Sequence, residues 1–453
     1  MRYVSTRGAA PVLGFSEVVL AGLATDGGLY VPEAWPQVTA PADGPYAQLA
    51  ASVFAPYLDA TVTPDVMNRL CAEAYSTFRH PDVVPLVGLE PGHQLMELFH
   101  GPTLAFKDVA LQLLGRLFDH ILNQRNEKVT IVGATSGDTG SAAIDGVRNC
   151  DNVDIVILYP KGRVSEVQRR QMTTVDSPNV RTVAIDGTFD DCQDLVKAMF
   201  NDPQFRERNN LSAVNSINWA RVMAQVVYYF EIARRVDGPF DVTVPTGNFG
   251  NVLSGWIAKQ MGAPVRHLVV ASNDNDILTR FFESLAMNVT GVQPTLSPSM
   301  DIQVSSNFER LLFEMNGRDG GLTAEQLRVF RDKGTLSVEP DQYERWIAPT
   351  FRASRASDHD TLTTIRSVHE STGMLIDPHT AVGVKAAREH AESGIPMVTL
   401  ATAHPAKFPD AVERATGVRP PLPAHLADLY DLPERTVDLA NDLAAVEAFV
   451  ESR

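Results

Sequence analysis

From about residue 86 onward, short runs of apolar and β-branched residues alternate with helical stretches, and a polar loop follows each run. Runs of this kind are typical of buried parallel strands that are covered by helices on both faces. The pattern therefore predicts an α/β fold with parallel sheets. We expect strands at 128–135, 154–160, 181–186, 241–246, 267–272 and 397–402, and helices at 141–149, 166–175, 191–200, 252–261, 277–285 and 411–416.

The remaining segments have a different pattern. Residues 1–85 are helical and loop-rich, with the clearest helices at 48–58 and 65–78. The segment 284–320 is polar and serine-rich, which indicates a large loop or a lid-like excursion, whereas 321–356 and 361–391 are mostly helical in pattern. We expect three parts: an N-terminal helical region (1–85), a first α/β domain (86–236), and a second α/β domain (237–453) that includes the excursion 284–320.

The polar loops all follow the expected strands directly. In parallel sheets, ligands bind outside the carboxyl ends of the strands, often at helix N-termini. The arrangement therefore indicates an enzyme before any motif is considered.

Composition narrows the class of protein further. The 453 residues are too many for one compact core. The net charge of −16 and the pI of about 5.1 disfavour nucleic acid and anionic membranes as partners. Three cysteines without a CxxC pair suit a reducing cytoplasm. No apolar stretch is long enough to span a bilayer, and the N-terminus lacks a secretory h-region, so we expect a cytoplasmic protein.

One loop has the composition of a phosphate cradle. It follows the expected strand 241–246 and opens a helix, so glycines would let an anion approach the first helical N–H groups. It lacks a lysine and is not a Walker motif. The alternative is a strand-to-helix turn that simply requires glycine. The loop consists of Gly247, Asn248, Phe249, Gly250 and Asn251.

A second loop, SGDTG, occupies the same place after the expected strand 128–135. Its hydroxyls and N–H groups suit a carboxylate at a helix N-terminus. The alternative is a plain helix cap. The candidate residues are Ser136, Gly137, Asp138 and Thr139.

Lys107 lies between Phe106 and Asp108 at the start of an apolar helix. Desolvation there would lower its pKa and free the amine to attack a carbonyl. The alternative, common for lysines, is a surface side chain at a helix start.

Two further loops follow strands. Lys161, Arg163 and Ser165 open a helix and could hold a substrate phosphate, or could form a solvated basic turn. Thr402 could donate a hydrogen bond to a ring nitrogen, whereas His404 alone is more often structural.

Several other sites are disfavoured because their motifs are missing. The chain has no HExxH, CxxC or GxSxG motif, which argues against a metalloprotease, a zinc site or an α/β-hydrolase. A GxGxxG after a first strand is also missing, which disfavours an NAD enzyme. We expect no metal.

An ordered set of motifs resembles the threonine synthase family of fold type II pyridoxal-phosphate enzymes. The resemblance covers residues 1 to about 420, and nothing is recognised in 420–453. The motifs are DGGLYVP (26–32), HGPTLAFKD (100–108), GATSGDTGSAA (133–143), NSINWAR (215–221), PTGNFGN (245–251), TLSPSMDI with SSNFERLL (295–312), DPHTAVG (377–383) and TAHPAKF (402–408).

The resemblance implies pyridoxal 5'-phosphate as cofactor and a fold like that of the tryptophan synthase β subunit. It implies that Lys107 is the Schiff-base lysine, that Phe106 packs on the cofactor ring, and that Thr402 bonds the pyridine nitrogen. Gly247 to Asn251 would hold the cofactor phosphate, and the SGDTG loop would hold the substrate carboxylate.

The activity that the resemblance implies is conversion of O-phosphohomoserine to threonine by a monomer or homodimer. Rival readings are a threonine synthase-like phospho-lyase, a serine/threonine dehydratase, and a non-catalytic protein that binds a phosphorylated ligand. If the KGRVS loop does not bind the substrate phosphate, Asn215, Arg221 or Lys407 are the next candidates.

Overall fold

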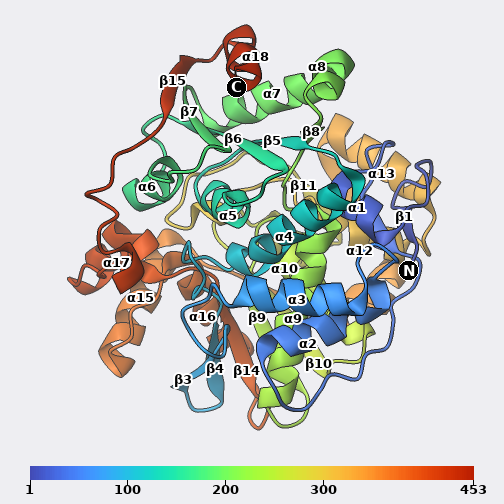
Figure 1. Cartoon of the computed structure of the whole chain (residues 1–453). Coiled ribbons are helices and arrows are strands. Elements are labelled where there is room, and N and C mark those ends of the chain that lie inside the picture. The colour runs from blue at the N-terminus through green and yellow to red at the C-terminus, as the bar shows by residue number, and fades with distance from the viewer. Residues whose placement is uncertain (453) are drawn as a thin grey trace.

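Two parallel sheets organise the chain, as Figure 1 shows in the computed structural model, which describes residues 1–452. The larger sheet has the order β13 (Phe351–Arg355), β10 (Val265–Ser272), β9 (Phe240–Pro245), β14 (Met397–Ala401), β4 (His93–Glu97) and β3 (Leu86–Glu90). Its strands are parallel except for β3, which is antiparallel to β4.

The second sheet is parallel throughout. Its order is β15 (Val437–Ala440), β7 (Val180–Asp186), β6 (Val153–Pro160), β5 (Val129–Ala134) and β8 (Leu211–Ser212). Short strand pairs β1 (Tyr3–Ser5) with β2 (Tyr30–Pro32), and β11 (Ala286–Asn288) with β12 (Thr335–Ser337), lie outside both sheets.

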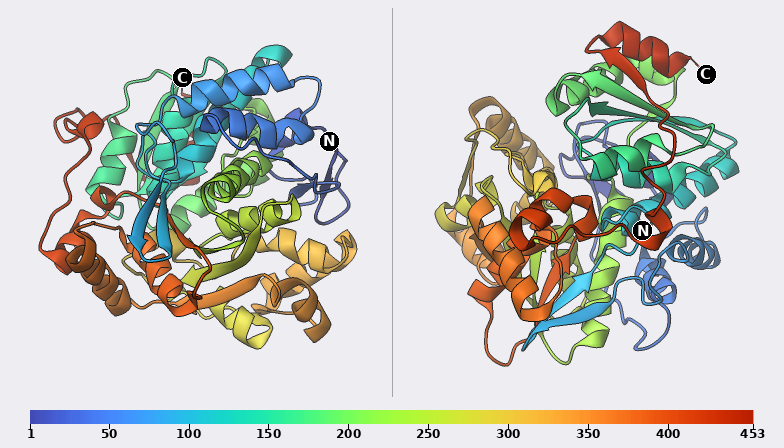
Figure 2. Two further views of the ribbon diagram at one scale, coloured as in Figure 1. Left: turned by 90° about the horizontal axis from the view of Figure 1, so that it is seen from below. Right: turned by 90° about the vertical axis from the view of Figure 1, so that its left-hand side faces the viewer.

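Helices cover the sheets, as two further views show (Figure 2). The predicted α/β class with parallel sheets is confirmed. The helices are α1 (Phe15–Ala21), α2 (Tyr46–Phe54), α3 (Pro64–Tyr75), α4 (Lys107–Arg125), α5 (Asp138–Val147), α6 (Glu166–Thr173), α7 (Phe189–Asn201), α8 (Pro203–Arg208), α9 (Trp219–Arg235), α10 (Gly250–Gln260), α11 (Ile277–Ser284), α12 (Phe308–Met315), α13 (Gly320–Lys333), α14 (Pro340–Gln342), α15 (Asp358–Thr372), α16 (Pro378–His390), α17 (Pro409–Thr416) and α18 (Leu443–Glu451).

Helix α4 is buried along most of its length and lies between the two sheets (Figure 1). It packs closely on α5 because two glycines meet there. A Cβ atom added to Gly115 would lie 1.9 Å from the carbonyl oxygen of Gly146, so neither helix tolerates a side chain at the contact. This contact fixes the relative position of α4 and α5, which begin at Lys107 and Asp138.

The predicted strands and the helices that follow them are all found within a few residues of the expected bounds. The predicted domain boundaries do not follow the sheets, however. Strands β3 and β4 lie in the first predicted α/β domain but belong to the larger sheet, where β4 pairs with β14. Strand β15, from the second predicted domain, joins the smaller sheet.

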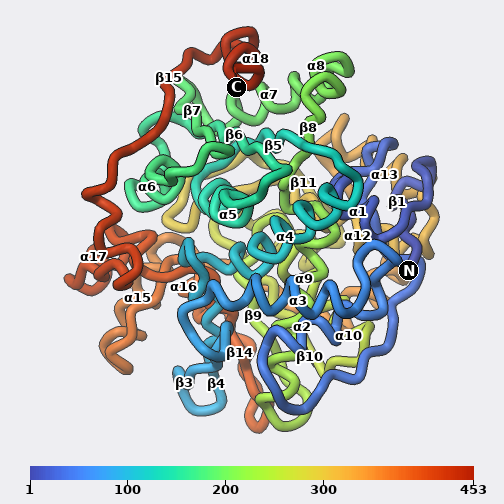
Figure 3. Tube along the Cα trace, viewed as in Figure 1, coloured from blue at the N-terminus to red at the C-terminus, as the bar shows by residue number. Residues whose placement is uncertain are grey.

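The C-terminal stretch that showed no recognisable motif links the two halves of the molecule. After α17 the chain runs along the outside to the smaller sheet, as the trace in Figure 3 shows. There β15 pairs in parallel with β7, and Val446 and Val450 of α18 join the core around Cys192 and Leu195.

Two other differences concern segments expected to be helical or loop-like. The range 321–356 contains strands β12 and β13 as well as α13. The segment 284–320 is a partly buried excursion that ends in α12. Among the described residues, no helix combines the length and apolarity needed to cross a membrane.

Candidate active site

The carboxyl ends of strands from both sheets meet at one place, as the sequence predicts. Lys107 opens α4, Asp138 opens α5 after β5, Gly247 follows β9, and Thr402 follows β14. The N–H of Phe106 donates to the carbonyl of Thr402 at 2.9 Å, so the loop before Lys107 is joined to the end of β14. The larger sheet and the smaller sheet therefore both contribute to one site.

Lys107 is buried, so the alternative interpretation of a surface lysine is wrong. Its Nζ lies 3.1 Å from Oδ2 of Asp138 and 5.0 Å from the centre of the Phe106 ring. Burial lowers the pKa of Lys107 below its ordinary value, although the Asp138 carboxylate opposes this shift. The amine is thus easier to deprotonate than that of an exposed lysine.

Asp138 is the centre of a dense polar cluster. Its Oδ1 lies 2.9 Å from Lys407 Nζ, in an ion pair, and accepts from Gln168 Nε2 at 2.7 Å. Its Oδ2 accepts from Lys107 and from Ser299 Oγ at 3.3 Å. Burial acts to raise the pKa of Asp138, but the two lysines together hold it well below its usual value. Asp138 is therefore an ionised carboxylate between two buried cations.

The turn before Asp138 is built from Thr135, whose Oγ1 accepts from the N–H groups of Gly137 and Gly140, each at 2.9 Å. Gly137 has a φ of 139°, and a Cβ atom there would lie 2.5 Å from the Gln168 side chain. The turn consequently requires glycine. Of the other predicted residues of this loop, Ser136 is exposed and Thr139 is half-buried.

Asp108, next to Lys107, holds the loop that precedes α4 through two hydrogen bonds from Thr103. Its oxygens accept from the N–H of Thr103 at 2.8 Å and from Thr103 Oγ1 at 2.7 Å. Burial raises the pKa of Asp108 to about 7, although these hydrogen bonds oppose the shift. The carbonyl of Thr103 in turn accepts from Lys407 Nζ at 2.7 Å.

The glycine-rich loop turns sharply into α10. Phe249 has a φ of 62°, in the left-handed region, and its buried ring packs against Phe308 and Phe351. Asn307 donates from its N–H and its Nδ2 to the carbonyl of Asn248, at 3.1 and 3.0 Å. The burial of Phe249 and the Asn307 bonds fix a backbone that most residues would not adopt.

The loop leaves little room for side chains and has one buried donor without a partner among the described residues. A Cβ atom on Gly247 would lie 2.6 Å from the Ser299 carbonyl oxygen, and one on Gly250 would lie 3.3 Å from Asn307 Nδ2. Asn251 accepts through Oδ1 from Tyr228 and Tyr229, but its Nδ2 is buried and has no partner among the described residues. These features fit a bound phosphate group.

Arg221 is a second buried donor without an acceptor. It lies in the first turn of α9, is 3% exposed, and has no partner for Nε and Nη1 among the described residues. Burial lowers its pKa to about 10, and its charge acts on Lys107. A buried guanidinium without an acceptor is energetically costly. Such a group suits a site that binds an anionic ligand.

The KGRVS loop requires a correction. Lys161 is 56% exposed, and its Nζ lies 2.6 Å from Oδ2 of Asp438 on β15. Arg163 is also exposed, whereas Ser165 caps α6 by accepting from the N–H of Gln168 at 3.3 Å. The structure therefore does not bring Lys161 and Arg163 into the cluster around Lys107. Helix α6, which follows this loop, contributes Gln168 to the cluster.

Sequence reasoning missed several members of the site. Gln168, Ser299, Ser305 and Asn307 come from a helix and from the excursion 284–320. Ser299, Ser305 and Asn307 lie in the motifs TLSPSMDI and SSNFERLL, but nothing in a loop of serines tells which strand end it will contact. His404 is structural, as expected of a lone histidine: its Nδ1 accepts from the N–H of Ala406 at 3.1 Å.

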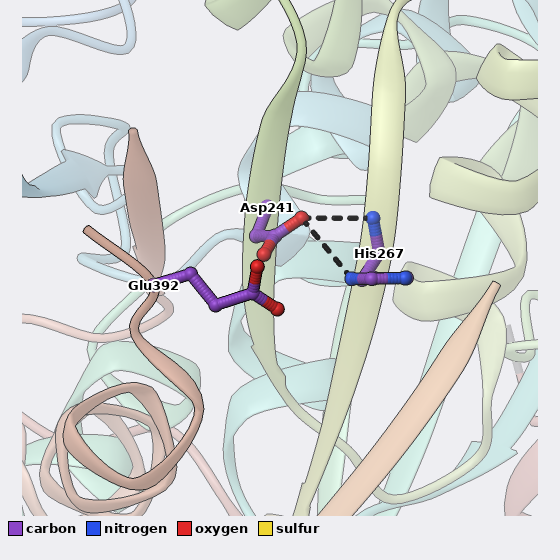
Figure 4. A group of neighbouring side chains, drawn as sticks. All are labelled: Asp241, His267 and Glu392. Carbon is purple, nitrogen blue, oxygen red and sulfur yellow. Dashed lines mark hydrogen bonds and ion pairs between the residues drawn. The ribbon is translucent and has the colours of Figure 1, made fainter. Parts of the chain in front are cut away.

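Another cluster of titratable groups lies at the opposite, amino ends of β9 and β10. It consists of Asp241, His267 and Glu392 (Figure 4). Arg266 donates to both Asp241 oxygens and, at 2.6 Å, to Glu392 Oε2. Because the guanidinium already neutralises the carboxylates, we assign this group as an ion-pair network.

Comparisons with known proteins agree over the whole chain. Family models match residues 2–75 (threonine synthase N terminus), 87–330 (pyridoxal-phosphate dependent enzyme) and 380–450 (threonine synthase, C-terminal). The chain is 54% identical to threonine synthase of Pseudomonas aeruginosa, over 99% of this chain and 98% of that one.

Two solved structures are also similar. One is pyridoxal-phosphate-bound threonine synthase of Brucella melitensis, with 52% identity, a TM-score of 0.96, and coverage of 99% of this chain and 98% of that one. The other is threonine synthase from yeast, with 40% identity, a TM-score of 0.94, and coverage of 100% and 98%.

Proposed function

The chain belongs to the threonine synthase family, and from this premise we propose which of its residues carry out the reaction. The reaction converts O-phospho-L-homoserine and water to L-threonine and phosphate, the last step of threonine biosynthesis, with pyridoxal 5'-phosphate as cofactor. The observation that best supports the residue assignment is the buried Lys107 amine, paired with Asp138 where the strand ends meet.

Residues from both sheets would hold the cofactor. Lys107 would bind it covalently, the N–H groups of Gly247 to Asn251 would bind its phosphate, and the Thr402 hydroxyl would bond its ring nitrogen. Phe106, whose ring lies beside the Lys107 amine, would pack against the ring. When bound, pyridoxal phosphate withdraws electrons from the substrate and so makes its α and β protons acidic.

Lys107 also moves protons. With cofactor and substrate bound, the Lys107 amine would take the proton from Cα of the substrate and would later serve as the acid that protonates Cγ. Burial keeps the pKa of Lys107 below that of an exposed lysine, which makes its neutral amine easier to form. The surrounding burial also excludes bulk water from these transfers.

Arg221 is our candidate for the substrate phosphate. Arg221 is buried, and two of its donor atoms have no partner among the described residues, so its desolvated charge can donate hydrogen bonds to a phosphate. The cations of the KGRVS loop are exposed instead. The SGDTG loop, at the start of α5, would hold the substrate carboxylate through Ser136, Gly137 and Thr139. This placement leaves Asp138 to act on Lys107.

Substitutions at Gly250 test the cofactor cradle. Gly250 has no positive φ, so a side chain there strains no backbone and acts through bulk alone. We expect Gly250→Val to weaken pyridoxal-phosphate binding about tenfold, the effect of losing about one hydrogen bond to a charged group. Cofactor titration by absorbance measures the affinity, and thermal unfolding of the cofactor-free protein measures stability.

Gly250→Ala is the matched control, because its single methyl group meets Asn307 Nδ2 at 3.3 Å and requires only a small shift. It should bind the cofactor almost as well as the wild type. Equal affinities for all three proteins would place the cofactor phosphate elsewhere.

Product analysis tests the function itself. Purified protein with cofactor should release one phosphate and form one threonine per O-phosphohomoserine consumed. A 2-oxo acid with ammonia would identify a phospho-lyase, and turnover of unphosphorylated serine or threonine would identify a dehydratase. Binding without turnover would identify a non-catalytic protein.

We also propose where the enzyme acts, what it binds and how it assembles. Cys71, Cys150 and Cys192 are free thiols, which supports action in the reducing cytoplasm. The net charge of −16 supports a small-molecule substrate without nucleic acid as a partner. We propose that the enzyme works as a monomer or homodimer, which sedimentation of the holoenzyme would decide.

A further inference from the structure

A second lysine, Lys407, is buried in the site and has no assigned role. It ends the short 3-10 helix η4 (Pro405–Lys407) that follows β14, and its side chain is 0% exposed. Its Nζ lies 2.9 Å from Asp138 Oδ1, in an ion pair, and donates to the carbonyl of Thr103 at 2.7 Å. Two acceptors therefore hold the buried amine in place.

Hydrogen bonds fix both the side-chain amine and the main chain of Lys407. Asp108 anchors Thr103, whose carbonyl also accepts from Gln171 Nε2 at 3.1 Å. The main-chain carbonyl of Lys407 accepts from Ser165 Oγ at 3.3 Å. Lys107, in contrast, makes one ion pair, at 3.1 Å, and its chemistry requires it to leave that pair.

The two lysines share one carboxylate. Before Lys107 can react it must give up a proton, and the neutral amine no longer balances the charge of Asp138. A buried carboxylate without a counter-charge is strongly disfavoured and would take up that proton. The carboxylate can stay ionised only if another cation remains beside it.

We propose that Lys407 is a positioning residue that remains the counter-charge of Asp138 when Lys107 becomes neutral, so that the proton leaves the Lys107–Asp138 pair. The proposal deepens the proposed function, on which it rests, because it explains how Lys107 becomes a nucleophile and base. Lys407 acts in this proposal through Asp138, with which its amine forms an ion pair.

The charged groups around the pair agree with this role. Facing Lys107 are Asp138 from α5, Lys407 from η4 and Arg221 from α9, and facing Asp138 there is also His379 from α16. After burial, the two cations lower the pKa of Lys107 and Asp138 raises it. Removing the Lys407 charge would therefore strengthen the hold of Asp138 on the Lys107 proton and raise the pKa of Lys107.

The test measures Lys107 in cofactor-free protein, without turnover. Reductive methylation with formaldehyde and cyanoborohydride, followed by peptide mass spectrometry, gives the rate at Lys107 as a function of pH. In Lys407→Met, a neutral side chain of similar length, we expect that rate to fall about tenfold at pH 7.5, with its profile shifted to higher pH.

The double variant Lys407→Met with Asp138→Asn removes both charges together. It should react at Lys107 at least as fast as the wild type, and this comparison also serves if Lys407→Met alone does not fold. A wild-type rate and pH profile in folded Lys407→Met would overturn the proposal, as would a double variant that stays slow. Because the assay needs no substrate, failure to form threonine would count against the proposed function alone.

Discussion

Replacing Lys107 by alanine should lower kcat/KM for O-phosphohomoserine by at least about 10³-fold, because the variant loses both the cofactor attachment and the general base. The thermal unfolding temperature of the cofactor-free variant should be close to that of the wild type. Lys107 pairs with Asp138, but Asp138 keeps Lys407, Gln168 and Ser299 as partners.

The matched control is Lys161→Ala, which removes a lysine from another strand-end loop. Its amine is 56% exposed and pairs with Asp438, and surface pairs contribute little. We expect nearly wild-type turnover. Retained threonine formation in Lys107→Ala would show that a different lysine does the chemistry.

Replacing Arg221 by glutamine should lower kcat/KM for O-phosphohomoserine about ten- to hundredfold. The reason is the loss of about 1.5–3 kcal/mol, which is the size of a hydrogen bond to a charged group. Steady-state kinetics measure the effect, and titration with pyridoxal phosphate should show nearly unchanged cofactor affinity.

Arg163→Gln makes the same chemical change in the exposed KGRVS loop and should leave kcat/KM near the wild-type value. If Arg163→Gln loses activity and Arg221→Gln does not, the substrate phosphate lies at KGRVS after all. If Arg221→Gln chiefly weakens cofactor binding, Arg221 serves the cofactor phosphate instead.

The sequence predicts the fold well where strands are buried on both sides. Strands such as β6 and β9 are buried along nearly their whole length and rich in apolar and β-branched residues, and a helix follows each. Edge strands lack this pattern. β13, with the sequence FRASR, contains two arginines, and β15 is mostly exposed, so neither shows an apolar run.

The site is predictable to the level of loops but not of individual contacts. Lys161 and Lys407 both follow buried strands, and the sequence gives no reason to prefer one. Lys161 pairs at the surface with Asp438, which is 277 residues away in the sequence. Lys407, at the end of η4, is buried and pairs with Asp138. Pairings over such separations depend on how the two sheets meet, which local pattern does not encode.

The same holds for Arg221 and for the excursion 284–320. Within α9, Arg221 is one arginine among several, and only the folded chain shows that it is buried without a partner. The serine-rich excursion looks like a solvated loop, yet Ser299 contacts Asp138 and Asn307 holds the glycine-rich loop.

The most direct test of the account is to identify the lysine that carries the cofactor. The holoenzyme is reduced with borohydride, digested, and its pyridoxyl peptide sequenced by mass spectrometry. We expect the label on Lys107, in the peptide that contains HGPTLAFKD, at about one per chain. A label on Lys407 or on any other lysine would contradict it.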